Sequence, residues 1–253
     1  MAENSPGGGC VYWRTRSLCS DDFLEGGMGL DWSVVYDYRE LFIRGVWNTV
    51  LLTTVAVICG TILGLFIGLG KMSDKIYLKA PAAIYVELFR GTPLFLQILL
   101  IHTAVIPGIW GLFFPEAKVP EALFSGFVAL TLNAAAYIAE IFRAGIQSID
   151  PGQMEAARSL GMTKGMAMRL ITIPQAFLRM LPALGNEFIA LLKDSSLLAI
   201  ISTPELGYAA FNIAKNTFER FPPYLTSGAI YLVLTLFLSR VVVRGLEKKY
   251  TPK

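Results

Sequence analysis

Four charged side chains lie in or next to long apolar stretches of this 253-residue sequence: Glu140, Glu187, Lys193 and Asp194. A charge at the centre of a membrane helix costs about 3 kcal/mol on insertion scales, so each should face a cavity or a partner. Lys193 is suited to orient a carboxylate and Asp194 an ammonium group, and an amino-acid zwitterion carries both. Structural alternatives stay open, because Lys193 and Asp194 can neutralise each other and Glu140 can pair with Arg143 at a helix end.

The residues before Glu140 have helical spacing. Asn133, Tyr137 and Glu140 follow at i, i+4 and i+7, which places them on one face of a helix. His102, the only histidine, lies among apolar residues, where a hydrogen-bonded core role is commoner than a role in a pathway. The full set of pathway candidates is Asn133, Tyr137, Glu140, Lys193, Asp194, Ser195, Ser196 and His102.

A long polar segment between the apolar stretches carries the signals of two short helices. Asp150 can cap the first helix, Pro151 suits its first turn, and Gly161 can adopt the left-handed conformation that ends it. Thr163 then starts a second helix that runs to Ile171, before the next proline begins a new segment.

The same segment resembles the EAA loop of ABC-importer permeases. Glu-Ala-Ala begins at Glu155, Gly161 follows after three further residues, and Ile-x-x-Pro ends the match at Ile171 and Pro174. In that family the loop forms a coupling helix that docks into a groove on a cytoplasmic ATPase. The resemblance assigns this role to Glu155, Ala156, Ala157, Arg158, Gly161, Ile171 and Pro174. A chance match in an interfacial helix is the alternative, which the fixed spacing of four anchors disfavours.

Three further stretches resemble signatures of the polar amino-acid permeases within that family. They are Glu-Leu-Phe-Arg-Gly-Thr-Pro at 87–93, the segment 133–143, and Leu-Leu-Lys-Asp-Ser-Ser-Leu at 191–197. In the first of them, Pro93 predicts a kink. Arg90 is expected to form an ion pair with Glu87 at the helix entrance, and direct contact with substrate is the alternative.

The resemblance covers about residues 31–250 and implies one transmembrane subunit of a type I ABC importer that works by alternating access. It also implies partners: a second permease subunit, identical or related, two ABC ATPase subunits, an extracytoplasmic amino-acid binding protein, and membrane lipid. ATP and magnesium are then expected on the ATPase, and this chain is expected to bind no cofactor and to be no enzyme.

Composition agrees with a membrane protein. Hydrophobic residues make up 54% of the chain and charged residues only 16%, whereas about 25% is usual for soluble domains. Four stretches without Asp, Glu, Lys or Arg are long enough to span a bilayer, and a fifth carries charges. They are 45–70, 91–115, 122–139 and 221–239, with the charged one at about 184–201. We expect an all-α polytopic fold with about five transmembrane helices, which the resemblance identifies as the MetI-like fold.

Orientation follows from the basic residues. Lys and Arg gather in the segments 71–79, 143–179 and 240–253, whereas the opposite loops hold only Lys118, Lys215 and Arg220. The N-terminal segment adds Arg14, Arg16, Arg39 and Arg44 to the opposite side, offset by seven acidic residues. The positive-inside rule therefore predicts an N-terminus outside and a C-terminus in the cytoplasm of a cell with an inner (plasma) membrane. The expected divisions are a flexible tail at 1–30, an interfacial approach helix at 31–45, the permease domain at 46–245 with its coupling helix at 150–174, and a cytoplasmic tail at 246–253.

Other functions find less support. No basic cluster with interleaved aromatics suggests nucleic acid, and Cys10, Cys19 and Cys59 have no metal-ligand spacing, although Cys10 and Cys19 could pair in an oxidising compartment. Gly70-Lys71 is followed by Met72, so it is no phosphate-binding loop. No metal spacing or Ser–His arrangement supports an intramembrane enzyme.

An ion-coupled secondary carrier or channel remains the alternative function. It would use Glu140, Lys193 and Asp194 as a relay, but it does not explain the EAA spacing. Three internal acids, Glu140, Glu187 and Asp194, outnumber the one internal lysine, Lys193. We therefore expect a cationic or neutral polar amino acid as substrate, with acidic amino acids not excluded.

Overall fold

The computed structural model of the chain describes residues 31–116 and 118–250, and every element within them is helical. Four helices are long and apolar enough to span a membrane: Arg39–Lys71, Leu94–Phe113, Ala122–Gln147 and Phe221–Lys248. A fifth candidate consists of two consecutive helices, Lys164–Ile201 and Leu206–Thr217, with a bend of 41° between them. The expected all-α fold is confirmed. The N-terminal tail, with Cys10 and Cys19, lies outside the described residues.

The spans are built from several labelled elements. They are α3 (Arg39–Lys71), α5 (Leu94–Leu100), the π-helical η1 (Ile101–Val105), α6 (Ile106–Phe113), α7 (Ala122–Gln147), α10 (Ile173–Asp194), the 3-10 helix η3 (Ser195–Ile201), α11 (Leu206–Thr217), α12 (Phe221–Phe237), the π-helical η4 (Leu238–Val243) and α13 (Arg244–Tyr250). The connecting elements are α2 (Ser33–Asp37), α4 (Ile76–Gly91), α8 (Pro151–Ser159), α9 (Lys164–Ala167) and the π-helical η2 (Met168–Thr172).

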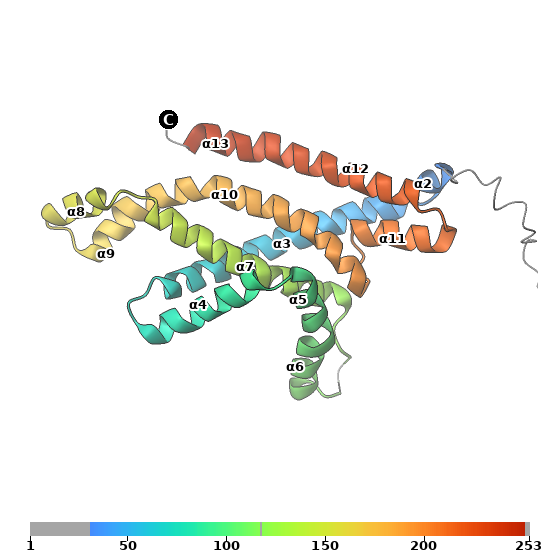
Figure 1. Ribbon diagram of the computed structural model, residues 1–253, viewed down its shortest axis with the longest axis horizontal. Coiled ribbons are helices and arrows are strands. Elements are labelled where there is room, and N and C mark those ends of the chain that lie inside the picture. Colours follow the sequence, from blue (N-terminus) through green and yellow to red (C-terminus); the bar gives the residue numbers. More distant parts are fainter. Residues whose placement is uncertain (1–30, 117, 251–253) are drawn as a thin grey trace, which may run out of the picture.

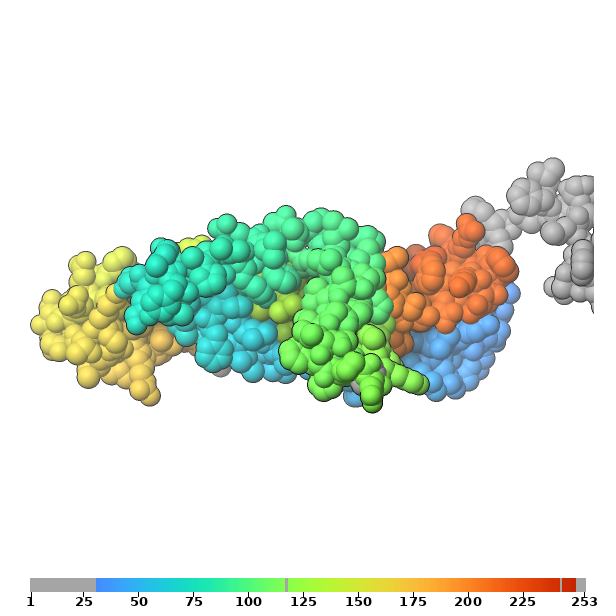
Figure 2. All heavy atoms as spheres, turned by 90° about the horizontal axis from the view of Figure 1, so that it is seen from below, coloured from blue at the N-terminus to red at the C-terminus, as the bar shows by residue number. Residues whose placement is uncertain are grey.

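The long helices form an elongated bundle (Figure 1). In that view α3, α7, α10 and α12 run along its length, with α8 and α9 at one end and α2 and α11 at the other. The α13 end of the chain points toward the α8 end. Figure 2 shows the face on which α4 lies and from which α6 projects.

A glycine ridge allows α3 and α7 to approach closely. A Cβ added at Gly60 would lie 2.8 Å from the Ala134 Cβ, and one at Gly64 would lie 2.8 Å from the Ala135 carbonyl oxygen. Gly68 likewise faces the backbone of Ala139. Small residues on both helices therefore make the contact, as is usual for helices in membranes. The ridge therefore serves packing within the chain.

Pro93 separates α4 from α5. Thr92 and Pro93 both have extended backbone conformations, as expected for a proline and the residue before it. The predicted kink is confirmed.

Pro174 does not begin a separate segment, contrary to the sequence analysis. It is the second residue of α10 and follows η2, so the predicted short helix continues past Ile171 into one helix over Lys164–Ile201. A proline lacks the N–H of the helix ladder and crowds the carbonyl one turn earlier, and a π turn can absorb both effects. Pro107 follows η1 in the same way.

The expected approach helix at 31–45 is divided. Helix α2 ends at Asp37, and its second part belongs to α3, which begins at Arg39. Val34 and Phe42 are buried against α11, which fixes the start of the first span to the bent fifth candidate.

Candidate functional site

A cavity of about 680 Å³ lies between α4, α7 and α10. Small residues of α7 and α10 leave the space, among them Ala144 and Ala183. Its polar and charged lining consists of Arg90, Tyr137, Glu140, Ser148, Arg179 and Glu187. A space with carboxylates and guanidinium groups on facing helices can hold a small zwitterion, because each end of such a molecule finds an opposite charge.

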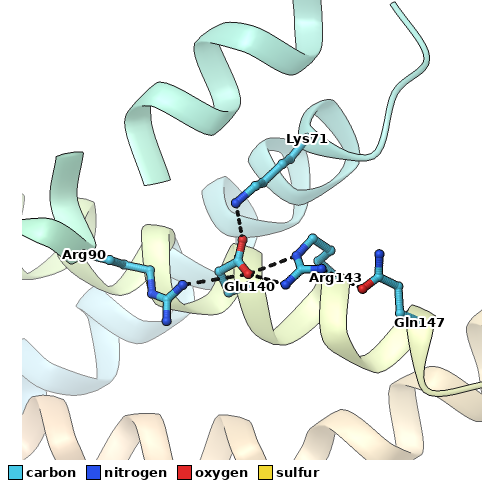
Figure 3. Close-up of polar contacts among 5 residues, drawn as sticks. All are labelled: Lys71, Arg90, Glu140, Arg143 and Gln147. Atoms are coloured by element: carbon cyan, nitrogen blue, oxygen red, sulfur yellow. Dashed lines mark hydrogen bonds and ion pairs between the residues drawn. The ribbon is translucent and has the colours of Figure 1, made fainter. Parts of the chain in front are cut away.

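Glu140 is the centre of the charged cluster (Figure 3). Its Oε1 lies 2.5 Å from Lys71 Nζ of α3, and its Oε2 accepts from Arg143 Nε and Nη2 at 2.9 and 2.8 Å. Arg90 Nη1 of α4 lies 3.8 Å from the same Oε2. One carboxylate thus connects α3, α4 and α7 through three cations, and the pairing with Arg143 foreseen as an alternative is present.

Arg90 does not form the expected ion pair and lies instead beside Tyr137 and Glu140. Its guanidinium carbon lies 5.3 Å from the centre of the Tyr137 ring, in addition to its contact with Glu140. No ion pair joins it to Glu87 in the described part of the chain. Arginine stacks well on aromatic faces while keeping its donors free at the edge. Arg90 therefore presents a positive charge to the cavity.

Asn133 lies away from this cavity. It is buried and donates to Gln97 Oε1 at 3.0 Å. Gln97 Nε2 in turn donates to the carbonyls of Phe89 and Thr92 at 2.7 and 3.0 Å. These carbonyls lie at the break before Pro93, where the helix ladder stops. Gln97, held by Asn133, therefore provides hydrogen-bond partners for the carbonyls at this break. The sequence gives no signal of this role, because the two residues are 36 positions apart.

Lys193 and Asp194 lie where α10 tightens into η3. Lys193 is exposed and Asp194 is half-buried, and neither is among the residues that line the 680 Å³ cavity. Ser195 and Ser196 donate to the carbonyls of Leu192 and Lys193 at 2.8 and 2.7 Å. Asp194 follows Glu187 by seven residues, so it extends the cavity-facing side of α10.

His102 lies in η1 and is partly buried. Its Nδ1 has no hydrogen-bond partner among the described residues. The hydrogen-bonded core role expected from sequence is therefore not seen for this atom, and His102 does not line the cavity.

Glu205 is a buried group that is not among the candidate residues from the sequence. Its carboxylate accepts from the backbone N–H groups of Gly207 and Tyr208 at 2.6 and 2.5 Å, which caps α11. It also accepts from the Tyr231 hydroxyl of α12 at 2.8 Å. Thr49 of α3 accepts from the Leu206 N–H at 3.1 Å. The only local signal is Pro204-Glu205 before a helical pattern, which is weak because glutamate is not a preferred N-cap.

The polar loop has the predicted caps. Asp150 Oδ1 accepts from the Gly152 N–H at 2.8 Å at the start of α8, and Thr163 Oγ1 accepts from Met166 N–H at 3.2 Å at the start of α9. Gly161 has φ of +89°.

The end of α8 is a Schellman motif. The N–H of Gly161 donates to the carbonyl of Arg158 at 3.0 Å, and that of Met162 to the carbonyl of Ala157 at 3.2 Å. Ala157 is buried, while Glu155, Ala156 and Arg158 are exposed. Leu160 is 83% exposed at this end of the molecule. The loop is thus a rigid, capped projection with an uncovered apolar tip.

Ile171 and Pro174 connect this projection to the bundle. They flank η2, through which α9 continues into α10. Met180, Ala183 and Glu187 of α10 then line the cavity. The structure therefore brings Tyr137 and Glu140 together at the cavity and keeps the loop residues together at one end. Glu187 and Arg179 were not among the candidates; Glu187 has a signal, a charge seven residues before Asp194, and Arg179 has none.

Comparison with known proteins agrees with these features. Residues 60–252 match the family model described as "Binding-protein-dependent transport system inner membrane component". The chain is 35% identical to the arginine transport system permease protein ArtQ of Bacillus subtilis (strain 168), covering 88% of this chain and 98% of that protein. It is 36% identical to the probable glutamine ABC transporter permease protein GlnM of the same organism, covering 86% and 96%.

Solved structures give the same result. A crystal structure of an amino acid ABC transporter with histidines has 45% sequence identity and a TM-score of 0.78, covering 87% of this chain and 99% of that one. The MetNI methionine ABC transporter, at 22% identity and a TM-score of 0.68, shares the fold, covering 81% and 96%. The chain is therefore an amino-acid ABC transporter permease subunit and belongs to the family of binding-protein-dependent transport system inner membrane components.

Proposed function

We propose that this subunit moves cationic or neutral polar amino acids across the inner membrane by ATP-driven alternating access. A separate ABC ATPase binds the α8–α9 projection, an extracytoplasmic binding protein delivers the substrate at the α11 end, and a second permease subunit completes the path. The N-terminus then lies outside and the C-terminus in the cytoplasm. The positions of α8 and α13 toward one end and of α2 at the other support this orientation (Figure 1).

The observation that carries the proposal is the continuity between projection and cavity. One helix runs from Lys164, beside the exposed tip, to Ile201, and its middle part lines the cavity. Arg179 Nη1 also donates to the carbonyl of Ser148 at 2.5 Å, which ties α10 to the end of α7. A partner that displaces α8 would therefore move two walls of the cavity together, as alternating access requires.

The substrate class is supported by the acidic groups that form no ion pair within the described residues. Lys71 and Arg143 already neutralise Glu140, which leaves Glu187 and Asp194 as the acidic groups along the cavity side of α10. They suit an ammonium or guanidinium group, and Arg90 suits the substrate carboxylate. Lys193 serves the carboxylate at the far end of the same path.

Two matched surface variants test the proposal. Leu160 and Phe218 are each 83% exposed, but they lie on the loop and on the C-cap of α11, toward opposite ends of the bundle. Leu160→Asp should weaken binding of the ATPase and reduce ATP-dependent uptake into proteoliposomes, while Phe218→Asp should leave ATPase binding unchanged.

The reverse result would place the ATPase at the wrong end and refute the proposal. The assay uses purified permease, ATPase and binding protein loaded in turn with each member of a panel of amino acids. Uptake that persists without any ATPase and collapses with the ion gradient would favour an ion-coupled carrier.

A further inference from the structure

A second recess, of about 600 Å³, lies at the turn between α3 and α4. It is separate from the larger cavity, and its lining is mainly polar. The end of α3 contributes Lys71, the turn contributes Ser73 and Asp74, α4 contributes Lys79, and α7 contributes Arg143. Three cations and one carboxylate therefore surround a space large enough for a small anionic group.

The cations of this recess differ in how many of their N–H groups already form hydrogen bonds. Arg143 uses Nε and Nη2 for Glu140 and Nη1 for Gln147. Lys71 directs Nζ to Glu140, which leaves further N–H groups of the ammonium free. Lys79 is exposed and forms no ion pair in the described residues. Lys71 and Lys79 thus offer donors to an anion, while Arg143 supplies charge.

The surface beside the recess is apolar. Ile76, Tyr77 and Leu78, in the first turn of α4, are all exposed large side chains. Lys75 precedes them and holds its ammonium 5.8 Å from the centre of the Tyr77 ring. The turn follows directly on α3, a span of 33 residues, so it lies where a membrane helix meets the headgroup region. Donors for an anion and an apolar surface for hydrocarbon therefore lie side by side.

We propose that this recess binds the headgroup of an anionic phospholipid, with the phosphate between Lys71 and Lys79 and the acyl chains along the exposed side chains of α4. The inference rests on the proposed function in one respect only, the assignment of the recess to the cytoplasmic leaflet. A basic pocket between helices at this surface suits an anionic headgroup. A free phosphate would satisfy the same donors but would leave Ile76 and Tyr77 uncovered. Because Lys71 also pairs with Glu140, a bound headgroup shares a cation with the wall of the larger cavity.

The test is a lipid titration of the purified full-length chain in detergent, followed by native mass spectrometry. Phosphatidylglycerol and phosphatidylcholine with identical acyl chains are compared, and the apparent Kd of the first lipid adduct is measured. The wild type should prefer phosphatidylglycerol. Lys79→Gln should weaken that adduct about fivefold, which is the contribution of one basic residue near an anionic membrane surface. Lys79 is exposed, so the variant should fold normally.

Lys248→Gln is the matched control, because Lys248 is an exposed lysine of α13, toward the same end but outside this recess. It should bind both lipids as the wild type does. Equal affinities for the two lipids, or equal losses in Lys79→Gln and Lys248→Gln, would overturn the proposal. Displacement of phosphatidylglycerol by inorganic phosphate at millimolar concentration would instead assign the recess to a soluble anion. These measurements need no ATPase, so a failure of the proposed transport function would leave them unaffected.

Discussion

Two glycines of the same loop allow its backbone conformation to be tested apart from its side-chain packing. Gly161 and Gly165 lie four residues apart, and a Cβ added at either would meet no atom within 4 Å. Only Gly161 has a positive φ, of +89°. Alanine at Gly161 therefore adds backbone strain and no steric contact, whereas alanine at Gly165 adds neither.

The expected magnitude follows from that difference. A left-handed conformation costs an ordinary L-residue roughly 1–2 kcal/mol, which corresponds to a factor of about 5 to 30 in an equilibrium constant. In Gly161→Ala the loop should relax when free and return to the Schellman geometry only on binding its partner. The Kd for the ATPase should then rise by up to that factor, and uptake should fall with it.

A purified permease titrated with ATPase subunits gives this Kd directly. Gly165→Ala should bind as the wild type does, and Gly161→Asn should recover part of the affinity, because asparagine tolerates the left-handed region better than alanine. Insertion and thermal stability should be nearly equal in all three variants, since no core contact changes. If Gly161→Ala binds and transports like Gly165→Ala, the coupling role of this turn is refuted.

Three further variants test the bundle and the path. Gly64→Ala places its Cβ about 0.6 Å closer to a backbone carbonyl oxygen than ordinary van der Waals contact allows. Such overpacking costs about 1–3 kcal/mol. In denaturant titrations this variant should therefore be less stable than Gly228→Ala, where the added Cβ meets no atom within 4 Å. Asp194→Asn should lower transport while insertion stays normal, and wild-type transport kinetics would contradict the path assignment. Glu205→Ala removes the cap of α11 and strands the Tyr231 hydroxyl, so it should lose about 1–3 kcal/mol of unfolding free energy; an unchanged midpoint would contradict this role.

The features predicted correctly from the sequence are those whose causes are local. The Asp150 carboxylate accepts a hydrogen bond from a backbone N–H two residues away. Gly161 ends the helix that it follows, and Pro93 breaks the helix at its own position. Long apolar stretches likewise indicate spans wherever they occur. Such signals need no knowledge of the neighbouring helices.

The features missed depend on residues that are distant in the chain. Lys71 meets Glu140 across 69 residues, and Gln97 meets Asn133 across 36. A spacing of i and i+7 shows that Asn133 and Glu140 share a helix face. It does not show that Asn133 holds the glutamine that bonds the free carbonyls before Pro93, or that Glu140 binds three cations. The break predicted at Pro174 is wrong for a related reason, because a proline breaks a helix only where no π turn accommodates it.

The continuity of α10 bears on how the proposed coupling could work. Its 22 residues span about 33 Å and are joined to α9 only through η2. A displacement of α8 must therefore either bend the chain at this π turn or move α10 as a rigid body. Thr172 is buried within the turn, and Gln175 donates to the carbonyl of Ile171 at 3.1 Å, so the turn is packed and this carbonyl has a hydrogen-bond partner. Rigid movement is then favoured, and it carries Glu187 past Arg90 of α4, because among the described residues no ion pair joins Arg90 to α10. The cavity should consequently open and close between α10 and α4, while α7, tied to α10 through Arg179, moves with it.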